Sequence, residues 1–278
     1  MDCAKGSLIR TKNSALPNFS QNAFYGLPYF NHNDFEKWGN GEFMLYTDYK
    51  YDSKQISDAE LAKEISIKNG SFGSLQEKIC FLREGNIKIT VFGDSISYGC
   101  EATAEGNAYF YKFANAIERK YGCKVDICNR SVIGNTTDDA LARLDSDFHG
   151  DDSQLVLTAF GMNDQNKFGS RLPIPPERFE KNLRRIADEL LQRNKFPVFI
   201  TPCVPNEKWV YCSGRIGEYA DIISKVAEEY HLPCADVYSL WTKQLEAGKR
   251  KNDLLNNAIN HPTDYGHFLY YLQLKQLI

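Results

Sequence analysis

The chain has 278 residues, of which 42% are hydrophobic and 25% are charged, and its formal net charge is -3. These values are ordinary for a globular protein, and the weakly acidic balance lacks the basic footprint of a nucleic-acid-binding protein. No apolar run approaches the roughly 18 residues that a membrane-spanning helix needs. We therefore expect a globular protein with no nucleic-acid partner and no membrane span.

The N-terminus and the cysteines bear on location and on metal binding. Residues 1–7 lack the apolar segment of a secretory signal, so we expect a cytoplasmic protein, with secretion after removal of a signal peptide left open. The eight cysteines form no C-x-x-C pair and follow no zinc-binding spacing. We interpret them as reduced thiols and expect no metal site.

Residues 1–74 differ from the rest of the chain. They are rich in Asn, Tyr, Phe, Lys and Asp and show few periodic apolar runs. Residues 43–49 resemble a strand, and Ser57 with Glu60 three positions later indicates the start of a helix. We expect an N-terminal extension that packs on the main domain, and its role stays unassigned.

Residues 75–278 alternate between strand-like and helix-like patterns. Short runs rich in β-branched and aromatic residues predict strands at 87–92, 124–128, 154–160, 196–201 and 233–237. Between them, apolar residues recur at helical spacing, from a helix at 74–83 to a last helix after Pro262. Strands separated by helices of this length form a parallel sheet that is covered on both faces.

The first of these strands ends at a group of small and polar residues. Gly93 permits a sharp turn, and Asp94 and Ser95 follow at once. Ligands of parallel sheets bind at the carboxyl ends of the strands, so Ser95 is placed where a nucleophile would lie.

Three further polar segments follow strands or precede helices at what we expect to be the same edge of the sheet: 129–136, 161–164 and 260–267. Acyl transfer needs a nucleophile, a base within hydrogen-bond reach and donors that face the developing oxyanion. Ser95 offers the hydroxyl, and His261 offers an imidazole that titrates near working pH. The backbone amide of Gly134 and the side-chain amide of Asn163 are candidate oxyanion donors, beside the backbone amide of Ser95.

Together these segments resemble the four sequence blocks of the SGNH hydrolases, the GDSL-type serine esterases. The matches are Ser95 in Val-Phe-Gly-Asp-Ser, Gly134 in Ser-Val-Ile-Gly-Asn, Asn163 in Gly-Met-Asn-Asp and His261 in Asn-His-Pro. The resemblance covers residues 75–278 and implies a flavodoxin-like three-layer α/β/α domain. It implies ester hydrolysis without a cofactor, with Ser95 as nucleophile, His261 as general base and then acid, and an oxyanion hole formed by Ser95, Gly134 and Asn163.

One position departs from the family pattern. Family members usually carry an aspartate three residues before the histidine, and here that position is Ala258. Such an acid orients the imidazole and stabilises the imidazolium. We consider three alternatives: a backbone carbonyl near 258–259 that leaves a Ser–His dyad, a carboxylate such as Asp253 or Asp264 in its place, or a protein without activity.

The substrate is the least determined part of the interpretation. We expect an esterase that removes a small acyl group, most simply acetyl, from a small molecule or a carbohydrate. Tyr98, Phe168 and Trp209 lie in loops near the four blocks and are candidates for lining the substrate site. The alternatives are a lysophospholipase or thioesterase of the same superfamily, and a non-catalytic carbohydrate-binding protein built on a hydrolase scaffold.

Overall fold

A computed structural model describes residues 58–69, 73–167 and 173–278. The strand expected at 43–49 and the residue Phe168 therefore lie outside the described residues. The chain divides into two units, Met1–Ile56 with Lys208–Val210, and Ser57–Glu207 with Tyr211–Ile278. The description below concerns the second and larger unit.

The centre of this unit is a parallel sheet of five strands. The strands are β1 (Asn86–Gly93), β2 (Lys124–Asn129), β3 (Leu155–Ala159), β4 (Phe196–Ile200) and β5 (Cys234–Ala235). Their order in the sheet is β2-β1-β3-β4-β5, and every neighbouring pair is parallel. This is the flavodoxin-like order, so the predicted fold class is confirmed.

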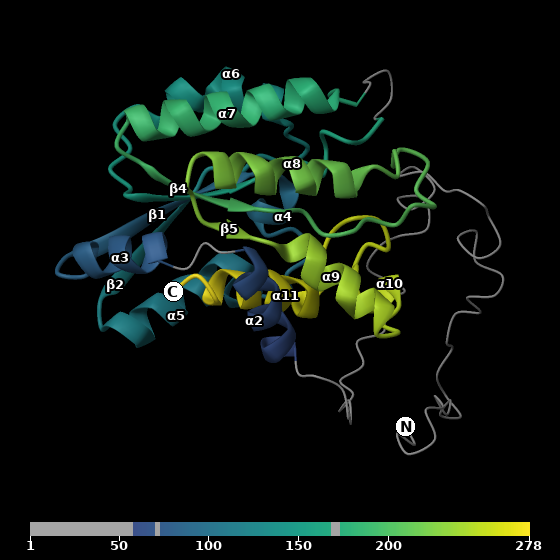
Figure 1. Cartoon of the computed structure of the whole chain (residues 1–278), viewed down its shortest axis with the longest axis horizontal. Coiled ribbons are helices and arrows are strands. Elements are labelled where there is room, and N and C mark those ends of the chain that lie inside the picture. Colours follow the sequence, from purple (N-terminus) through teal and green to yellow (C-terminus); the bar gives the residue numbers. More distant parts are fainter. Residues whose placement is uncertain (1–57, 70–72, 168–172) are drawn as a thin grey trace, which may run out of the picture. The chain divides into compact units, whose positions relative to one another are not determined.

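Helices flank the sheet on both sides (Figure 1). The helices and the 3₁₀ turn η3 are α2 (Asp58–Asn69), α3 (Gly73–Leu82), α4 (Ser95–Tyr98), η3 (Glu105–Asn107), α5 (Tyr109–Tyr121), α6 (Thr137–Phe148), α7 (Pro176–Gln192), α8 (Ile216–Glu229), α9 (Val237–Glu246), α10 (Lys251–Leu254) and α11 (Asp264–Lys275). Figure 1 shows α6, α7 and α8 on one side of the sheet and α2, α5, α9 and α11 on the other.

Each face of the sheet has its own apolar core, because successive side chains of a strand point to opposite faces. On the side of α6, α7 and α8, Phe92 and Val156 pack in one cluster with Leu183. On the opposite side, Val91 and Leu157 belong to a second cluster. Since both faces are covered, β1 is buried from Ile89 onward and reads in the sequence as a continuous apolar run.

Two helices were not expected from the sequence. Helix α9 begins at Val237, which the sequence analysis had placed at the end of the fifth strand, and β5 is only two residues long. The Asp236 side chain caps α9 by accepting a hydrogen bond from the Ser239 amide at 3.1 Å. The cap shortens the strand because the chain becomes helical as soon as it leaves the sheet.

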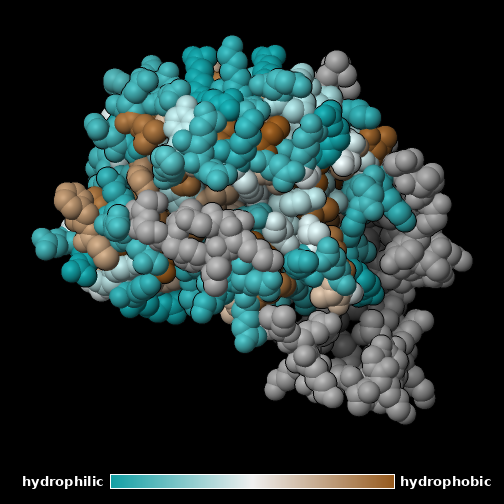
Figure 2. All heavy atoms as spheres, viewed as in Figure 1, coloured by the Kyte–Doolittle hydropathy of each residue, from teal (hydrophilic) through white to brown (hydrophobic). Residues whose placement is uncertain are grey.

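Helix α2 lies at the junction with the N-terminal part of the chain. It belongs to the larger unit and contacts α9 and α11. The division that we expect at residue 75 stays a prediction, because most of residues 1–74 lie outside the described part. No helix of the described residues is long and apolar enough to cross a membrane. On the face seen in Figure 2, hydrophilic residues dominate and apolar residues form small separate patches.

Candidate active site

The turn after β1 holds Ser95 in place. Asp94 is the N-cap of α4, and its Oδ1 atom accepts a hydrogen bond from the Ile96 amide at 2.9 Å. Ser95 is the first residue of α4 and is only 3% exposed. A Cβ atom at Gly93 would lie 2.6 Å from the carbonyl oxygen of Ala159, so only glycine fits where the strand ends.

His261 meets this serine from the C-terminal part of the chain. Its Nε2 atom lies 2.9 Å from Ser95 Oγ, which is hydrogen-bond distance. The loop before it is fixed by Asn257, whose Oδ1 atom accepts hydrogen bonds from the amides of Ile259, Asn260 and His261, each at 2.9 Å. The loop therefore presents the imidazole to Ser95 in a defined orientation.

The loops after β2 and β3 are tied to each other. Asn163 donates from Nδ2 to the carbonyl oxygen of Asn135 at 3.0 Å, and Asn135 follows Gly134. Gly134 has a φ of +77°, a left-handed conformation that favours glycine. Asp164 joins the same loops by accepting from the amides of Thr137 at 2.9 Å and Gly161 at 3.0 Å.

Two buried carboxyl groups support these turns. Burial raises the pKa of Asp94 to about 7, with the neighbouring Asp164 adding to the rise against the hydrogen bond from Ile96. Burial likewise raises the pKa of Asp164 to about 6, against the hydrogen bonds from Thr137. Carboxyl groups with raised pKa values cluster at functional sites, and both of these lie beside the residues identified above.

The second nitrogen of the His261 ring faces a carboxylate that the sequence analysis missed. His261 Nδ1 lies 4.0 Å from Glu101 Oε1, and the two side chains are 17% and 27% exposed. The His261 imidazole and the Asn256 amide hold the pKa of Glu101 below its usual range, against the opposing effect of burial. Glu101 lies in the loop after α4, and only its closeness in sequence to Ser95 could have drawn attention to it.

The sequence candidates for orienting His261 have other partners. Asp253 Oδ1 accepts from the Arg250 guanidinium at 2.8 Å, and Asp264 Oδ1 accepts from the Thr103 amide at 2.9 Å. The carbonyl oxygens of Ala258 and Ile259 accept from the side chain and backbone of Asn206, at 2.9 and 2.7 Å.

The three candidates for the substrate site have different outcomes. Tyr98 is 57% exposed at the end of α4. Phe168 lies outside the described residues, and Trp209 belongs to the smaller unit, so their placement in the substrate site stays a prediction.

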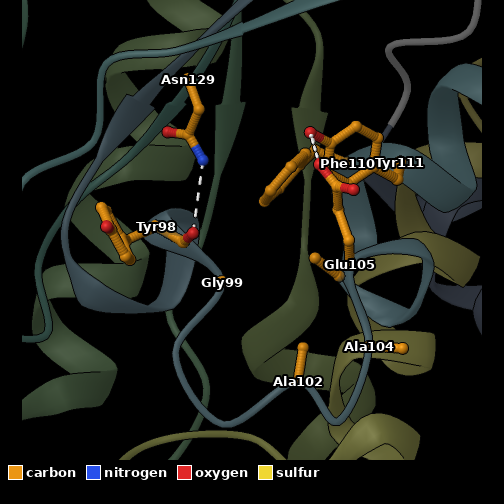
Figure 3. Close-up of a pocket in the computed structure, with 9 residues that line it drawn as sticks. Tyr98, Gly99, Ala102, Ala104, Glu105, Phe110, Tyr111 and Asn129 are labelled. Atoms are coloured by element: carbon orange, nitrogen blue, oxygen red, sulfur yellow. Dashed lines mark hydrogen bonds between the residues drawn. The ribbon is translucent and has the colours of Figure 1, made fainter.

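Tyr98 also lines a pocket of about 230 Å³ beside α4. In Figure 3, Tyr98 and Asn129 lie on one side of this pocket, and Glu105, Phe110 and Tyr111 lie on the other. Asn129 donates from Nδ2 to the carbonyl oxygen of Ser97 at 2.9 Å, which joins the end of β2 to the helix that carries Ser95.

No group of three or more His, Cys, Asp or Glu side chains within the described residues is arranged to hold a metal ion. The seven cysteines of the same residues have free thiols, among them Cys80 and Cys128 on the surface.

Comparison with known protein families matches residues 91–269 to the GDSL-like Lipase/Acylhydrolase family. No curated protein matches the chain. Among solved structures, the chain is similar to Axe2, an acetylxylan esterase from Geobacillus stearothermophilus, with 21% identity and a TM-score of 0.59 over 70% of this chain and 96% of that one. Forms of Axe2 with a serine, an aspartate or a histidine replaced by alanine are described as catalytic mutants.

A second similar structure is LAE5, an alpha/beta hydrolase enzyme from the metagenome of Lake Arreo in Spain. It shares 22% identity and a TM-score of 0.57 over 69% of this chain and 96% of that one. At these identities the two structures show a shared fold.

Proposed function

The chain belongs to the GDSL-like lipase/acylhydrolase family of carboxylic ester hydrolases, and we propose that it is a serine esterase that acts through an acyl-enzyme on Ser95. The observation that carries the proposal is the 2.9 Å contact between His261 Nε2 and Ser95 Oγ, which joins residues 166 positions apart. A nucleophile and a base within hydrogen-bond reach are the first requirement of acyl transfer.

In the proposed first step, Ser95 Oγ attacks the ester carbonyl carbon while His261 Nε2 takes the hydroxyl proton. The carbonyl oxygen becomes an oxyanion, which the amides of Ser95 and Gly134 and the side-chain amide of Asn163 stabilise. One N–H of Asn163 is bound to Asn135, and a carboxamide has two such donors, so a second one is available for the oxyanion. His261 then gives its proton to the leaving alcohol, and the acyl group stays on Ser95.

In the second step, a water molecule replaces the alcohol. His261 takes a proton from this water, the resulting hydroxide attacks the acyl carbon, and the same donors hold the second oxyanion. Collapse of this intermediate breaks the bond to Ser95 Oγ, which recovers its proton from His261. The products are a carboxylic acid and the unmodified enzyme, so the cycle needs no cofactor.

We propose a small acyl group, acetyl in the first instance, carried by a carbohydrate. Support comes from the shared fold with an acetylxylan esterase. Further support comes from the exposed Tyr98 ring beside a pocket with Asn129 and Glu105 in its walls, because sugar rings stack on aromatic side chains and hydrogen-bond to amides and carboxylates. We retain the cytoplasm as the proposed location, since the described cysteines are free thiols.

One observation favours a second candidate within the same family. Val132 and Ile133, which directly precede Gly134, are 43% and 59% exposed. Apolar side chains at the edge of the candidate site could accommodate a longer acyl chain, as in a lysophospholipase or a thioesterase. The length of the acyl chain is therefore the variable that separates the two candidates.

The test is hydrolysis of p-nitrophenyl esters from acetate to decanoate, with wild type beside Ser95→Ala, followed by acetylated xylooligosaccharides. We expect the highest kcat/KM on acetate, no activity in the folded variant, and acetate release from the oligosaccharides. A maximum at long chains would favour the second candidate. Absence of hydrolysis on every ester, together with no labelling of Ser95 by a fluorophosphonate, would leave a carbohydrate-binding protein on a hydrolase scaffold.

A further inference from the structure

We propose that Glu101 is the positioning residue for the His261 imidazole, from a place in the chain different from that of the usual family aspartate. The inference rests on the proposed function, because it concerns how the base of that reaction is held. The family position three residues before the histidine is Ala258, which cannot supply a carboxylate. Glu101 approaches from the opposite side of the sequence, in the loop directly after the helix that carries Ser95.

The imidazole of His261 needs an acceptor at Nδ1. If Nε2 is to accept the proton of Ser95, a neutral ring must carry its own proton on Nδ1. Nδ1 is buried and has no hydrogen-bond partner within the part of the chain that the structure describes. A buried donor without a partner costs about 1–3 kcal/mol. Glu101 Oε1, 4.0 Å away, can supply the missing acceptor after an approach of about 1 Å, the distance by which such contacts tighten in a substrate complex.

The Glu101 carboxylate is held toward the ring by the histidine loop itself. Asn256 donates from Nδ2 to Glu101 Oε2 at 2.8 Å, and its backbone amide donates to the carbonyl oxygen of His261, also at 2.8 Å. One asparagine thus fixes the carboxylate and the histidine to each other. Oε1, the oxygen that Asn256 does not bind, is the one nearest to Nδ1.

The loop that carries Glu101 is tied at both ends. On one side, the Cys100 amide donates to the carbonyl oxygen of Ser95 at 3.0 Å. On the other, Thr103 and Asn107 donate to Asp264 at the start of α11, with distances of 2.9 and 3.0 Å. The loop therefore connects the nucleophile segment to the histidine segment, with Glu101 between them.

Glu101 has an unusual backbone conformation. Its φ is +67°, in the left-handed region that residues with long side chains rarely adopt and that costs on the order of 1–3 kcal/mol. Strain of this kind persists where the surrounding contacts enforce it, and it clusters at functional sites. Here the strained residue is the one that directs its carboxylate toward the imidazole.

The experiment compares Glu101→Gln, Glu101→Asp and Asp253→Asn with wild type in p-nitrophenyl acetate hydrolysis across pH. Gln keeps the shape of Glu and an oxygen for Asn256 but loses the charge. We expect kcat to fall about 10²-fold, less than the roughly 10⁴-fold of a buried triad aspartate because Glu101 is partly solvated. We expect KM to change by less than about twofold, since the imidazole acts on the reaction barrier and not on ground-state binding.

The pH profile separates positioning from a structural role. Without the negative charge near Nδ1, the imidazolium is less stable, so the ascending limb of kcat/KM moves to lower pH in Glu101→Gln. Glu101→Asp keeps the charge, and we expect an intermediate kcat with the limb close to its wild-type position. Asp253→Asn is the matched control, a carboxylate-to-amide change on the side chain paired with Arg250, and should retain wild-type kcat.

Each outcome bears on a different claim. A Glu101→Gln protein with wild-type kcat, or with reduced kcat and an unmoved pH profile, would overturn the positioning role, as would a large loss in Asp253→Asn. Fluorophosphonate labelling of Ser95 supplies a second readout, which should slow in parallel with kcat. A wild-type protein that is neither active nor labelled would overturn the proposed function, and the Glu101 role with it.

Discussion

The two ends of the central sheet both bury polar groups, but they treat them in opposite ways. At the amino ends of β3 and β4, Lys195 donates from Nζ to Asp151 Oδ1 at 2.9 Å and to the carbonyl oxygen of Ser153 at 2.7 Å. Although burial raises the pKa of Asp151, the hydrogen bonds from Ser153 and Lys195 hold it well below its usual range. At the carboxyl ends, burial leaves Asp94 and Asp164 with raised pKa values, and His261 Nδ1 lacks a close partner.

This difference separates a structural network from a functional one. The Lys195–Asp151 pair satisfies its charges within the protein, so it stabilises the fold and offers nothing to a ligand. The groups around Ser95 are held in less stable states, a cost that is tolerated where polar groups must be available for a reaction. Changes at the carboxyl end should therefore alter activity, and changes at the amino end should alter stability.

The largest expected effect is at Ser95. Ser95→Ala should reduce kcat by on the order of 10⁶-fold, because the variant has no nucleophile. Its melting temperature should stay near the wild-type value, since the change removes one oxygen atom from a nearly isosteric side chain. Ester hydrolysis and thermal unfolding of the same preparation measure both. Hydrolysis at a comparable rate by the folded variant would remove Ser95 from the mechanism.

The opposite pattern is expected at Lys195. Lys195→Met keeps the apolar stem but leaves Asp151 buried without its ion-pair partner, which should lower the free energy of unfolding by about 3 kcal/mol. Urea denaturation measures this loss. The folded variant should retain its kcat on p-nitrophenyl acetate, because the pair lies at the far end of the sheet. A large loss of kcat with unchanged stability would contradict the division between the two ends.

Asn163 tests the carboxyl end by a smaller step. Asn163→Ala removes one oxyanion donor and should lower kcat by about 10²–10³-fold, with little change in KM. The variant also loses the hydrogen bond to Asn135, so its unfolding should be measured beside its kinetics. An unchanged kcat would place Asn163 outside the oxyanion hole.

The smallest expected effect is a pH dependence at Asp94. Its pKa is about 7 in the folded protein and ordinarily 3.8, so between these values the folded protein keeps a proton that the unfolded chain has released. Stability therefore falls as pH rises through this window, by up to about 1.4 kcal/mol per pH unit.

Asp94→Asn removes that proton exchange while keeping an oxygen for the Ile96 amide. Its free energy of unfolding should decline less between pH 4.5 and about 7, with the remaining slope due to Asp164. Urea denaturation at several pH values measures both slopes. An equal slope in variant and wild type would show that Asp94 does not carry this dependence.

The sequence by itself determined the parallel sheet, its strand order through the family resemblance, and the residues that meet at its edge. It could do so because buried strands read as apolar runs and because Ser95, Gly134 and Asn163 each follow a strand, where parallel topology brings them together. The start of α9 was misplaced, since a strand end and a helix start with the same apolar residue cannot be told apart by periodicity.

Only the tertiary structure decided which carboxylate faces His261. Asp253 and Asp264 are close to the histidine in sequence, but they have Arg250 and Thr103 as partners. Glu101 is 160 residues away and reaches the imidazole because a strained loop passes between the nucleophile helix and the histidine loop. Sequence patterns report local periodicity and motif spacing, whereas the pairing of one carboxylate with one imidazole depends on how distant loops meet in three dimensions.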